Sequence, residues 1–244
     1  MRKWKSGIAG LLLGVWMAGG AVDAAGIQGY GQGCRYDTEN RPVGAVEFNA
    51  QYGGYDACAL SGDDRYILLT FDQGYENGYT AQILDTLKEK NVKAIFFLTG
   101  DYAKKETALV QRMVDEGHVL GNHGMTHASM PRLDRAGLEE EIMSLHDYVL
   151  DTYGYEMQYL RPPCGEYSEE TLAAVQALGY KTVFWSFAYV DWLTDQQPDP
   201  AQAYSRMTQA AHGGGIYLLH SVSATNCAVL GDVIDSLRQQ GYLL

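Results

Sequence analysis

The sequence predicts an α/β protein: an irregular (β/α) barrel of six to seven parallel strands with a short N-terminal extension. From Tyr66 onward, short apolar runs alternate with helical patterns, an order typical of a parallel sheet with right-handed crossovers. Only six or seven strands are visible, too few for an eight-fold barrel. An open doubly wound sheet is the alternative, but no glycine fingerprint for a dinucleotide or phosphate loop follows any strand.

The strands are expected at continuous apolar runs, because strands buried on both faces of a sheet lack polar alternation. These runs cover residues 67–71, 94–98, 119–120, 159–160, 182–185 and 216–219. The helices are expected where apolar residues recur every three or four positions, as at Ile83, Leu84 and Leu87. Such patterns cover residues 79–90, 107–116, 134–153, 169–178, 201–211 and 229–240. Asp134 is the expected N-cap of the longest helix.

The first residues have the pattern of a secretory signal peptide. Three basic residues precede a short apolar stretch, and Val22 and Ala24 stand as in a small-x-small cleavage site. The apolar stretch is too short to favour a retained membrane anchor, the alternative interpretation. We therefore expect a signal peptide over residues 1–25, a linker or N-terminal extension over residues 26–64, and one domain over residues 65–244.

The composition excludes nucleic acid as a partner and leaves the thiol chemistry open. Thirty acidic and eighteen basic residues give a net charge of −12, whereas duplex binding requires a basic face. Four cysteines remain after export: Cys34, Cys58, Cys164 and Cys227. An even number in an oxidising compartment predicts two disulfides with three possible pairings. Free buried thiols are the alternative, and a zinc knuckle is disfavoured because the sequence has no CxxC pair.

Polar clusters follow five of the predicted strands, at the carboxyl ends where α/β folds place active sites. They contain Asp72 with Gln73, His123 with His127, Arg161 with Cys164, Asp191 with Trp192, and His220. Five clusters at successive strand ends are hard to explain as helix caps alone. Two histidines four residues apart can hold one metal ion if the turn between them brings the rings together. No glutamate follows His123, so the H-E-x-x-H pattern of zinc proteases is absent.

Five motifs in this order resemble those of family-4 carbohydrate esterases, the NodB-like polysaccharide deacetylases. They are TFDQG at residues 70–74, HGMTH at 123–127, RPPCG at 161–165, DW at 191–192 and LLH at 218–220. The longer runs TFDQGYENGYT, RPPCGEYS and WSFAYVDW are similar to one branch, the peptidoglycan N-acetylmuramic acid deacetylases of muramic δ-lactam formation. The resemblance covers roughly residues 66–244 and makes the expected domain a NodB-like one.

The resemblance implies a hydrolase of carbon–nitrogen bonds that removes an acetyl group from an amino sugar. It implies one divalent metal ion, zinc first, with cobalt, nickel or manganese as alternatives. The ligands would be His123, His127 and Gln73, and the metal would polarise the carbonyl and acidify a water. Most of the family has an aspartate in place of Gln73, and a neutral amide is a weaker ligand. Gly124 stands where the family often has Ser or Thr, which removes a hydroxyl that would brace the metal loop.

The resemblance also assigns the proton transfers. Asp72 would be the general base and His220 the general acid. Arg161 would keep the base ionised, and Asp191 would orient the acid histidine.

On the substrate side, the resemblance implies that Trp192 stacks on the sugar and that the backbone N–H of Cys164 faces the oxyanion. Tyr167 and Tyr189 are groove candidates because they lie near these motifs. The Cys164 side chain is then free for a disulfide with Cys227, which leaves Cys34 to pair with Cys58.

The expected function is therefore deacetylation of N-acetylmuramic acid in peptidoglycan, for muramic δ-lactam in the spore cortex. The expected partner is the peptidoglycan strand, and the mature chain is expected to be a monomer without stable membrane association. Its place would be the cell wall or another extracytoplasmic compartment, including the forespore intermembrane space. One alternative is an N-acetylglucosamine deacetylase acting on peptidoglycan or chitin-like oligomers. Another is an inactive glycan-binding homologue, which Gln73 alone favours.

Overall fold

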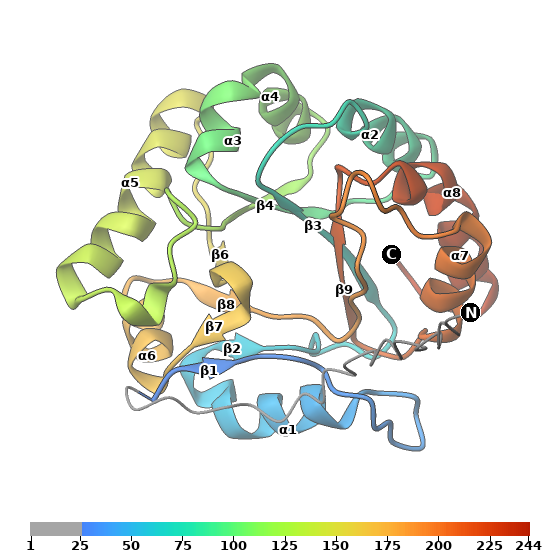
Figure 1. Ribbon diagram of the computed structural model, residues 1–244, viewed down its shortest axis with the longest axis horizontal. Helices are drawn as coiled ribbons and strands as arrows, with labels where there is room; N and C mark the ends of the chain where they lie inside the picture. Colours follow the sequence, from blue (N-terminus) through green and yellow to red (C-terminus); the bar gives the residue numbers. More distant parts are fainter. Residues whose placement is uncertain (1–25) are drawn as a thin grey trace, which may run out of the picture.

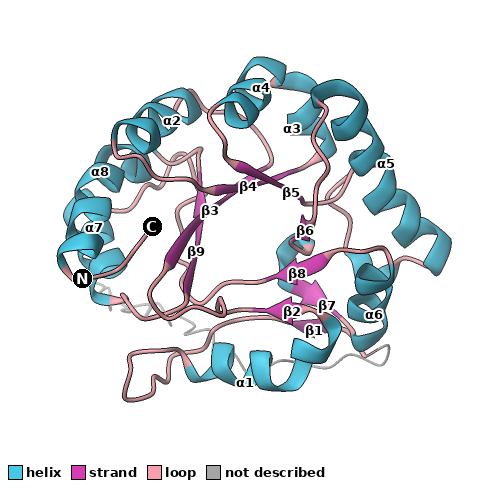
Figure 2. Cartoon of the chain, turned by 180° about the vertical axis from the view of Figure 1, so that it is seen from behind, coloured by secondary structure: helices cyan, strands magenta, loops and turns pink. Residues whose placement is uncertain are grey.

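The computed structural model describes residues 26–244, so the expected signal peptide lies outside the described residues. One curled sheet forms the centre of the molecule, and most of the helices lie around its outer face (Figure 1). Figure 2 shows the same ring of helices from behind. Across residues 26–244, no helix combines the length and apolarity needed to cross a membrane.

The sheet has seven parallel strands in the order β2-β8-β6-β5-β4-β3-β9. They are β2 (Ala57–Cys58), β3 (Ile67–Gln73), β4 (Ile95–Leu98), β5 (Val119–Asn122), β6 (Tyr159–Leu160), β8 (Lys181–Val183) and β9 (Gly215–His220). The chain after β8 connects the two edges. Phe184 N donates to Cys58 O on β2, and Ser186 N donates to Ile216 O on β9. These bonds link the edges without a regular strand pair, and the predicted irregular barrel is confirmed.

Every predicted helix is present on the outside of the sheet. The helices are α2 (Thr80–Glu89), α4 (Thr107–Asp115), α5 (Arg135–Tyr153), α6 (Glu169–Ala177), α7 (Pro200–Gln209) and α8 (Ala224–Gln239). Asp134 caps α5 as expected, because its side chain accepts from Gly137 N at 2.8 Å. α8 begins earlier than predicted, at a Ser223 cap that accepts from Asn226 N. The short helix α3 (Gly100–Lys105) and the 3-10 turns η2 (Met130–Arg132) and η3 (Pro163–Gly165) were not predicted.

Strand alternation divides the core between the two faces of the sheet. Phe96 of β4 faces the helices and stacks on Phe71 of β3, with ring centroids 5.2 Å apart. Its neighbour Phe97 belongs to a smaller cluster with Val183 and Ile216 on the other face. The guanidinium of Arg161 lies 4.2 Å from the Phe97 ring centroid. A buried cation is therefore packed beneath the carboxyl ends of the strands.

The N-terminal extension is folded and belongs to the same body. β1 (Gln28–Gly29) pairs antiparallel with β7 (Glu166–Tyr167). It is followed by α1 (Val43–Tyr52), the turn η1 (Gly53–Tyr55) and β2, the edge strand of the main sheet. α1 packs through Phe48 and Tyr52 in a separate aromatic core. The segment expected to be a linker therefore supplies one strand of the barrel, while a domain boundary at residue 65 stays a prediction.

The cysteines do not form the two expected disulfides. All four are free thiols. Cys164 is exposed in the loop after β6, whereas Cys227 lies on α8, where its Sγ contacts Gln82 of α2. Cys34 is exposed, whereas Cys58 lies on β2, where burial raises the pKa of its thiol to about 11. The expected pairs Cys164–Cys227 and Cys34–Cys58 are wrong because their members lie on different elements with different surroundings.

Candidate active site

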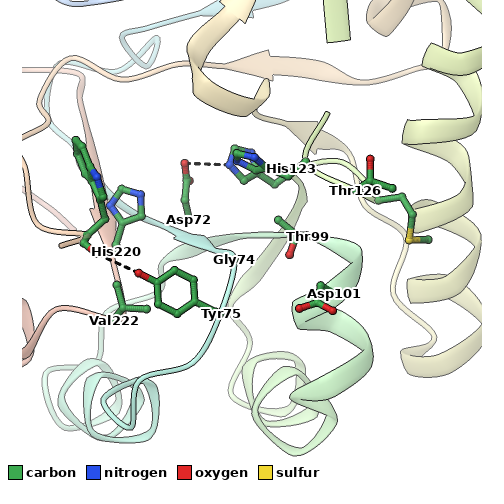
Figure 3. Close-up of a pocket in the computed structure, with 12 residues that line it drawn as sticks. Asp72, Gly74, Tyr75, Thr99, Asp101, His123, Thr126, His220 and Val222 are labelled. Carbon is green, nitrogen blue, oxygen red and sulfur yellow. Dashed lines mark hydrogen bonds and ion pairs between the residues drawn. The ribbon is translucent and has the colours of Figure 1, made fainter. Parts of the chain in front are cut away.

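The polar residues predicted from the sequence meet at the carboxyl edge of the sheet. Asp72 of β3 and His220 of β9 are register partners on neighbouring strands. His123 directly follows β5, and Arg161 directly follows β6. Figure 3 shows Asp72 between His123 and His220. The parallel topology brings together residues that are up to 148 positions apart in the chain.

Asp72 is held by a fully buried arginine. Arg161 Nη1 donates to Asp72 Oδ1 and to Thr70 Oγ1, both at 2.8 Å. Its Nε and Nη2 donate to the backbone carbonyls of Val183 and Phe184. Burial alone would raise the pKa of Asp72, but the Arg161 charge and hydrogen bond, together with the neighbouring His123 and His220, outweigh burial and hold the pKa below its usual range. Asp72 is therefore a carboxylate at neutral pH.

His220 is held by a second buried carboxylate. Asp191 accepts from the His220 ring Nδ1 at 2.7 Å and from the His220 backbone N at 2.8 Å. Asn226 Nδ2 also donates to Asp191, at 2.6 Å. Burial opposes protonation of the ring, yet the hydrogen bond and charge of Asp191 raise the pKa of His220 above its ordinary value. With Nδ1 bound to Asp191, Nε2 is the ring nitrogen left to serve a substrate. Asn226 was not predicted, because it stands outside the motifs on α8.

The two predicted metal ligands face one another. The rings of His123 and His127 have centroids 4.8 Å apart. His123 Nδ1 bonds to Arg161 O at 2.7 Å, while its Nε2 lies 3.5 Å from Asp72 Oδ2. Burial lowers the pKa of His123 to about 4. The ring is therefore neutral at physiological pH, and its tautomer leaves the Nε2 lone pair turned toward Asp72.

A carboxylate on α5 braces the loop that carries His127. Glu141 is buried and accepts from Thr126 N at 2.8 Å, Thr126 Oγ1 at 2.9 Å and Ala128 N at 3.2 Å. Gly124 has a φ of +85°, and a Cβ there would lie 2.6 Å from Glu141 Oε1. The hydroxyl expected to be missing at Gly124 is thus replaced by Glu141, which the sequence analysis did not identify because it lies on the following helix.

In the described chain, the site contains only part of the donor set that the implied metal ion requires. Among residues 26–244, no group of three His, Cys, Asp or Glu side chains is placed to hold a metal ion. The two imidazoles of His123 and His127, whose rings converge, do fit a transition metal with further positions open. Gln73 lines neither part of the groove; its Nε2 donates to Ser221 Oγ, and its Oε1 is buried without a partner. A role of Gln73 as a ligand stays a prediction.

Two adjoining cavities of about 410 and 640 Å³ form a groove over these residues. Both are lined by Asp72, His123, His127, Trp192 and His220. The Trp192 side chain is 42% exposed, and its ring centroid lies 5.5 Å from that of His220. The hydroxyl of Tyr75, which also lines the smaller cavity, donates to Trp192 O at 3.1 Å. Trp192 is therefore accessible to a ligand beside the proposed acid.

The other predicted substrate contacts divide between the groove and the core. Cys164 and Tyr189 line the larger cavity. Cys164 has a φ of +57°, in the left-handed region that is uncommon for residues other than glycine. Tyr167 does not line the groove: it is 6% exposed, packs against Phe48, and its hydroxyl donates to Gln28. The expectation that Tyr167 contacts substrate is wrong, because β1 and α1 cover its ring.

The barrel, with a buried carboxylate and three imidazoles at the carboxyl edge of its sheet, defines a sugar deacetylase. The profile of the polysaccharide deacetylase family matches residues 59–183, and this chain belongs to that family, family 4 of the carbohydrate esterases. It is 40% identical over 245 residues to peptidoglycan-N-acetylmuramic acid deacetylase PdaA of Bacillus subtilis, covering 98% of this chain and 92% of PdaA. The solved PdaA structure has a TM-score of 0.84 over 90% of this chain and 94% of that one.

Two further relatives show how far the similarity extends. A family 4 carbohydrate esterase from Bacillus anthracis is 36% identical, with a TM-score of 0.74 over 90% of this chain and 93% of that one. Peptidoglycan-N-acetylglucosamine deacetylase PgdA of Listeria monocytogenes is 30% identical over 179 residues, 73% of this chain and 37% of PgdA. The similarity in sequence thus extends to relatives named for different sugars.

Proposed function

We propose that this protein hydrolyses the N-acetyl group of N-acetylmuramic acid in peptidoglycan. The observation that carries the proposal is the pairing of Asp72 with His220 across β3 and β9, with their pKa values moved in opposite directions. Asp72 stays ionised and His220 stays protonated over the same pH range, which provides a base and an acid at one site. The similarity to PdaA over nearly the whole chain supports the choice of sugar.

The residues divide the reaction into two proton transfers. Asp72 accepts a proton from the attacking water, and Arg161 keeps the carboxylate oriented through the bond to Oδ1. His220 then donates a proton to the sugar nitrogen as the C–N bond breaks, because the nitrogen would otherwise have to leave as an anion, which is a poor leaving group. Asp191 stabilises the imidazolium before this transfer. The products are acetate and the free amine.

A divalent metal would be held by His123 and His127, with Gln73 Oε1 as the candidate third donor. It would polarise the substrate carbonyl and lower the pKa of the attacking water. The more acidic water matters here because Asp72, a carboxylate of lowered pKa, is a weak base. We propose zinc first, since neutral imidazole suits zinc, with cobalt, nickel or manganese as alternatives. The backbone N–H of Cys164 is the proposed additional donor to the developing oxyanion.

The proposed place of action is outside the cytoplasmic membrane, on the peptidoglycan strand. Residues 1–25 would direct export, and the chain would work as a monomer in the wall or the forespore intermembrane space. The name of PdaA supports peptidoglycan as the substrate, and a role in spore-cortex δ-lactam rests on the motif runs.

The test is incubation of the purified protein with peptidoglycan, with and without a chelator, followed by acetate measurement and sugar analysis. We expect acetate and deacetylated muramic acid, loss of both with chelator, and recovery with zinc. Deacetylated glucosamine instead would assign the chain the activity for which PgdA is named. Glycan binding without acetate at any added metal would identify an inactive homologue. Asp72→Asn is the control for contaminating activity.

A further inference from the structure

The larger cavity extends beyond the proposed catalytic residues, and the N-terminal extension forms one of its walls. Gly31 and Gln32 line it together with Trp185 and Cys164. The family profile begins at residue 59, so this wall lies outside the part of the chain that the profile matches. The wall comes from the segment that sequence analysis treated as a linker.

The wall is fixed to the barrel by several independent contacts. Tyr30 N donates to Gly165 O at 2.8 Å, and the Tyr30 hydroxyl donates to Trp185 O at 2.6 Å. The Tyr30 ring lies 4.6 Å from that of Phe184, between centroids. A Cβ at Gly44 would lie 2.7 Å from Gln32 O, so α1 approaches the wall closely only because residue 44 is glycine. Gln32 is thus positioned before any ligand binds.

The side chains of this region have the chemistry of a sugar subsite. Trp185 Nε1 donates to Gln32 Oε1 at 2.9 Å, which orients the amide, while Gln32 Nε2 makes only a 3.5 Å contact with Ala188 O. That amide therefore has donor capacity left for a hydroxyl or carbonyl of a ligand. The indole rings of Trp185 and Trp192 also line this cavity, and such rings pack against the apolar side of a pyranose.

The charge of the cavity indicates which sugar it suits. Of the described residues that line it, Asp72 is the only carboxylate, and none is a lysine or an arginine. A carboxylate-bearing muramic acid would find no cation there, apart from histidines that belong to the catalytic centre. An uncharged ring with hydroxyl and acetamido groups requires none.

We propose that the Gln32 wall forms a subsite for an uncharged N-acetylhexosamine next to the sugar being deacetylated. The proposal rests on the proposed function, because the subsite extends the same groove. The protein would then read two neighbouring sugars, one at the catalytic residues and one against Gln32 and Trp185.

The test compares Gln32→Ala with the wild type on peptide-free peptidoglycan fragments of two and of four or more sugars. The matched control is Gln51→Ala, on the exposed surface of α1 in the same extension. We expect kcat/KM in Gln32→Ala to fall about 3- to 10-fold on both lengths, the worth of one hydrogen bond, because two sugars already fill both positions. Gln51→Ala should show little change on either length. No loss in Gln32→Ala, or an equal loss in Gln51→Ala, would overturn the subsite.

A binding measurement separates this proposal from the proposed function. The N-acetylglucosamine trisaccharide is titrated into the wild type and both variants, and the dissociation constants are compared. Weaker binding by Gln32→Ala alone supports the subsite even if the wild type releases no acetate. If the wild type releases acetate and all three proteins bind the trisaccharide with the same affinity, the proposed function stands and the proposed subsite is refuted. Thermal unfolding of each variant checks that the extension remains folded.

Discussion

The brace from Glu141 to the histidine loop gives the sharpest prediction about the metal site. The side chain accepts three hydrogen bonds from the loop, two of them from backbone N–H groups. Glu141→Ala leaves both N–H groups without a partner, at about 1–3 kcal/mol each. We therefore expect the free energy of unfolding to fall by roughly 2–6 kcal/mol, with loosening of the loop that carries His127. Glu141→Gln keeps one acceptor oxygen and should lose about 1–2 kcal/mol, mainly the charge assistance.

The assay measures zinc affinity by competition with a chromogenic chelator, alongside thermal unfolding of the metal-free protein. Mutation of a residue that orients a metal ligand typically weakens metal affinity by about 10–100-fold. We expect the loss of zinc affinity in Glu141→Ala to fall in that range. Glu141→Gln should recover most of the affinity. Glu140→Ala is the matched control, one position away and exposed on α5. If Glu141→Ala bound zinc as tightly as Glu140→Ala, the positioning role would be refuted.

The remaining predictions concern the acid, the base and their supports. Asp72→Asn should lower kcat about 10²–10⁴-fold while zinc affinity is retained, whereas His123→Ala should lose zinc first; full turnover in Asp72→Asn would contradict its role as base. Asp191→Asn removes the charge that raises the pKa of His220, so the alkaline limb of the kcat–pH profile should move to lower pH. An unmoved limb would mean that another group is the acid. Arg161→Met leaves the buried Asp72 carboxylate unpaired, and the free energy of unfolding measured in urea should fall by about 3–5 kcal/mol. A loss below about 1 kcal/mol, as for an exposed ion pair, would contradict the buried Arg161–Asp72 pair.

Most of the barrel could be predicted because its elements have local signals. The continuous apolar runs of β3 and β4 and the 3.6-residue periodicity of α2 arise from burial of each element against the next. The motifs at the strand ends placed Asp72 and His220 at one edge, since parallel strands present the same end to the same side. These features survive in a one-dimensional pattern because each depends on neighbours a few positions away.

The extension escaped prediction because its signals are weak or absent. α1 has buried Ala45, Phe48 and Tyr52 but little contrast between its faces, and β2 has only two residues. Neither gives a usable period. The prediction for Tyr167 was wrong because a strong local signal was misleading. Its place beside a motif suggested a groove contact, but β1 and α1 enclose its ring.

The sequence by itself determined the family, the barrel class, and the residues proposed as acid, base and metal ligands, because these follow from residue types in a fixed order along the chain. Only the tertiary structure decided how they are supported. Glu141 in place of a hydroxyl at Gly124, Asn226 on Asp191, four separate thiols and the Gln32 wall all depend on contacts between distant segments. Such contacts follow from which surfaces exclude water together, and no local pattern of residues records that.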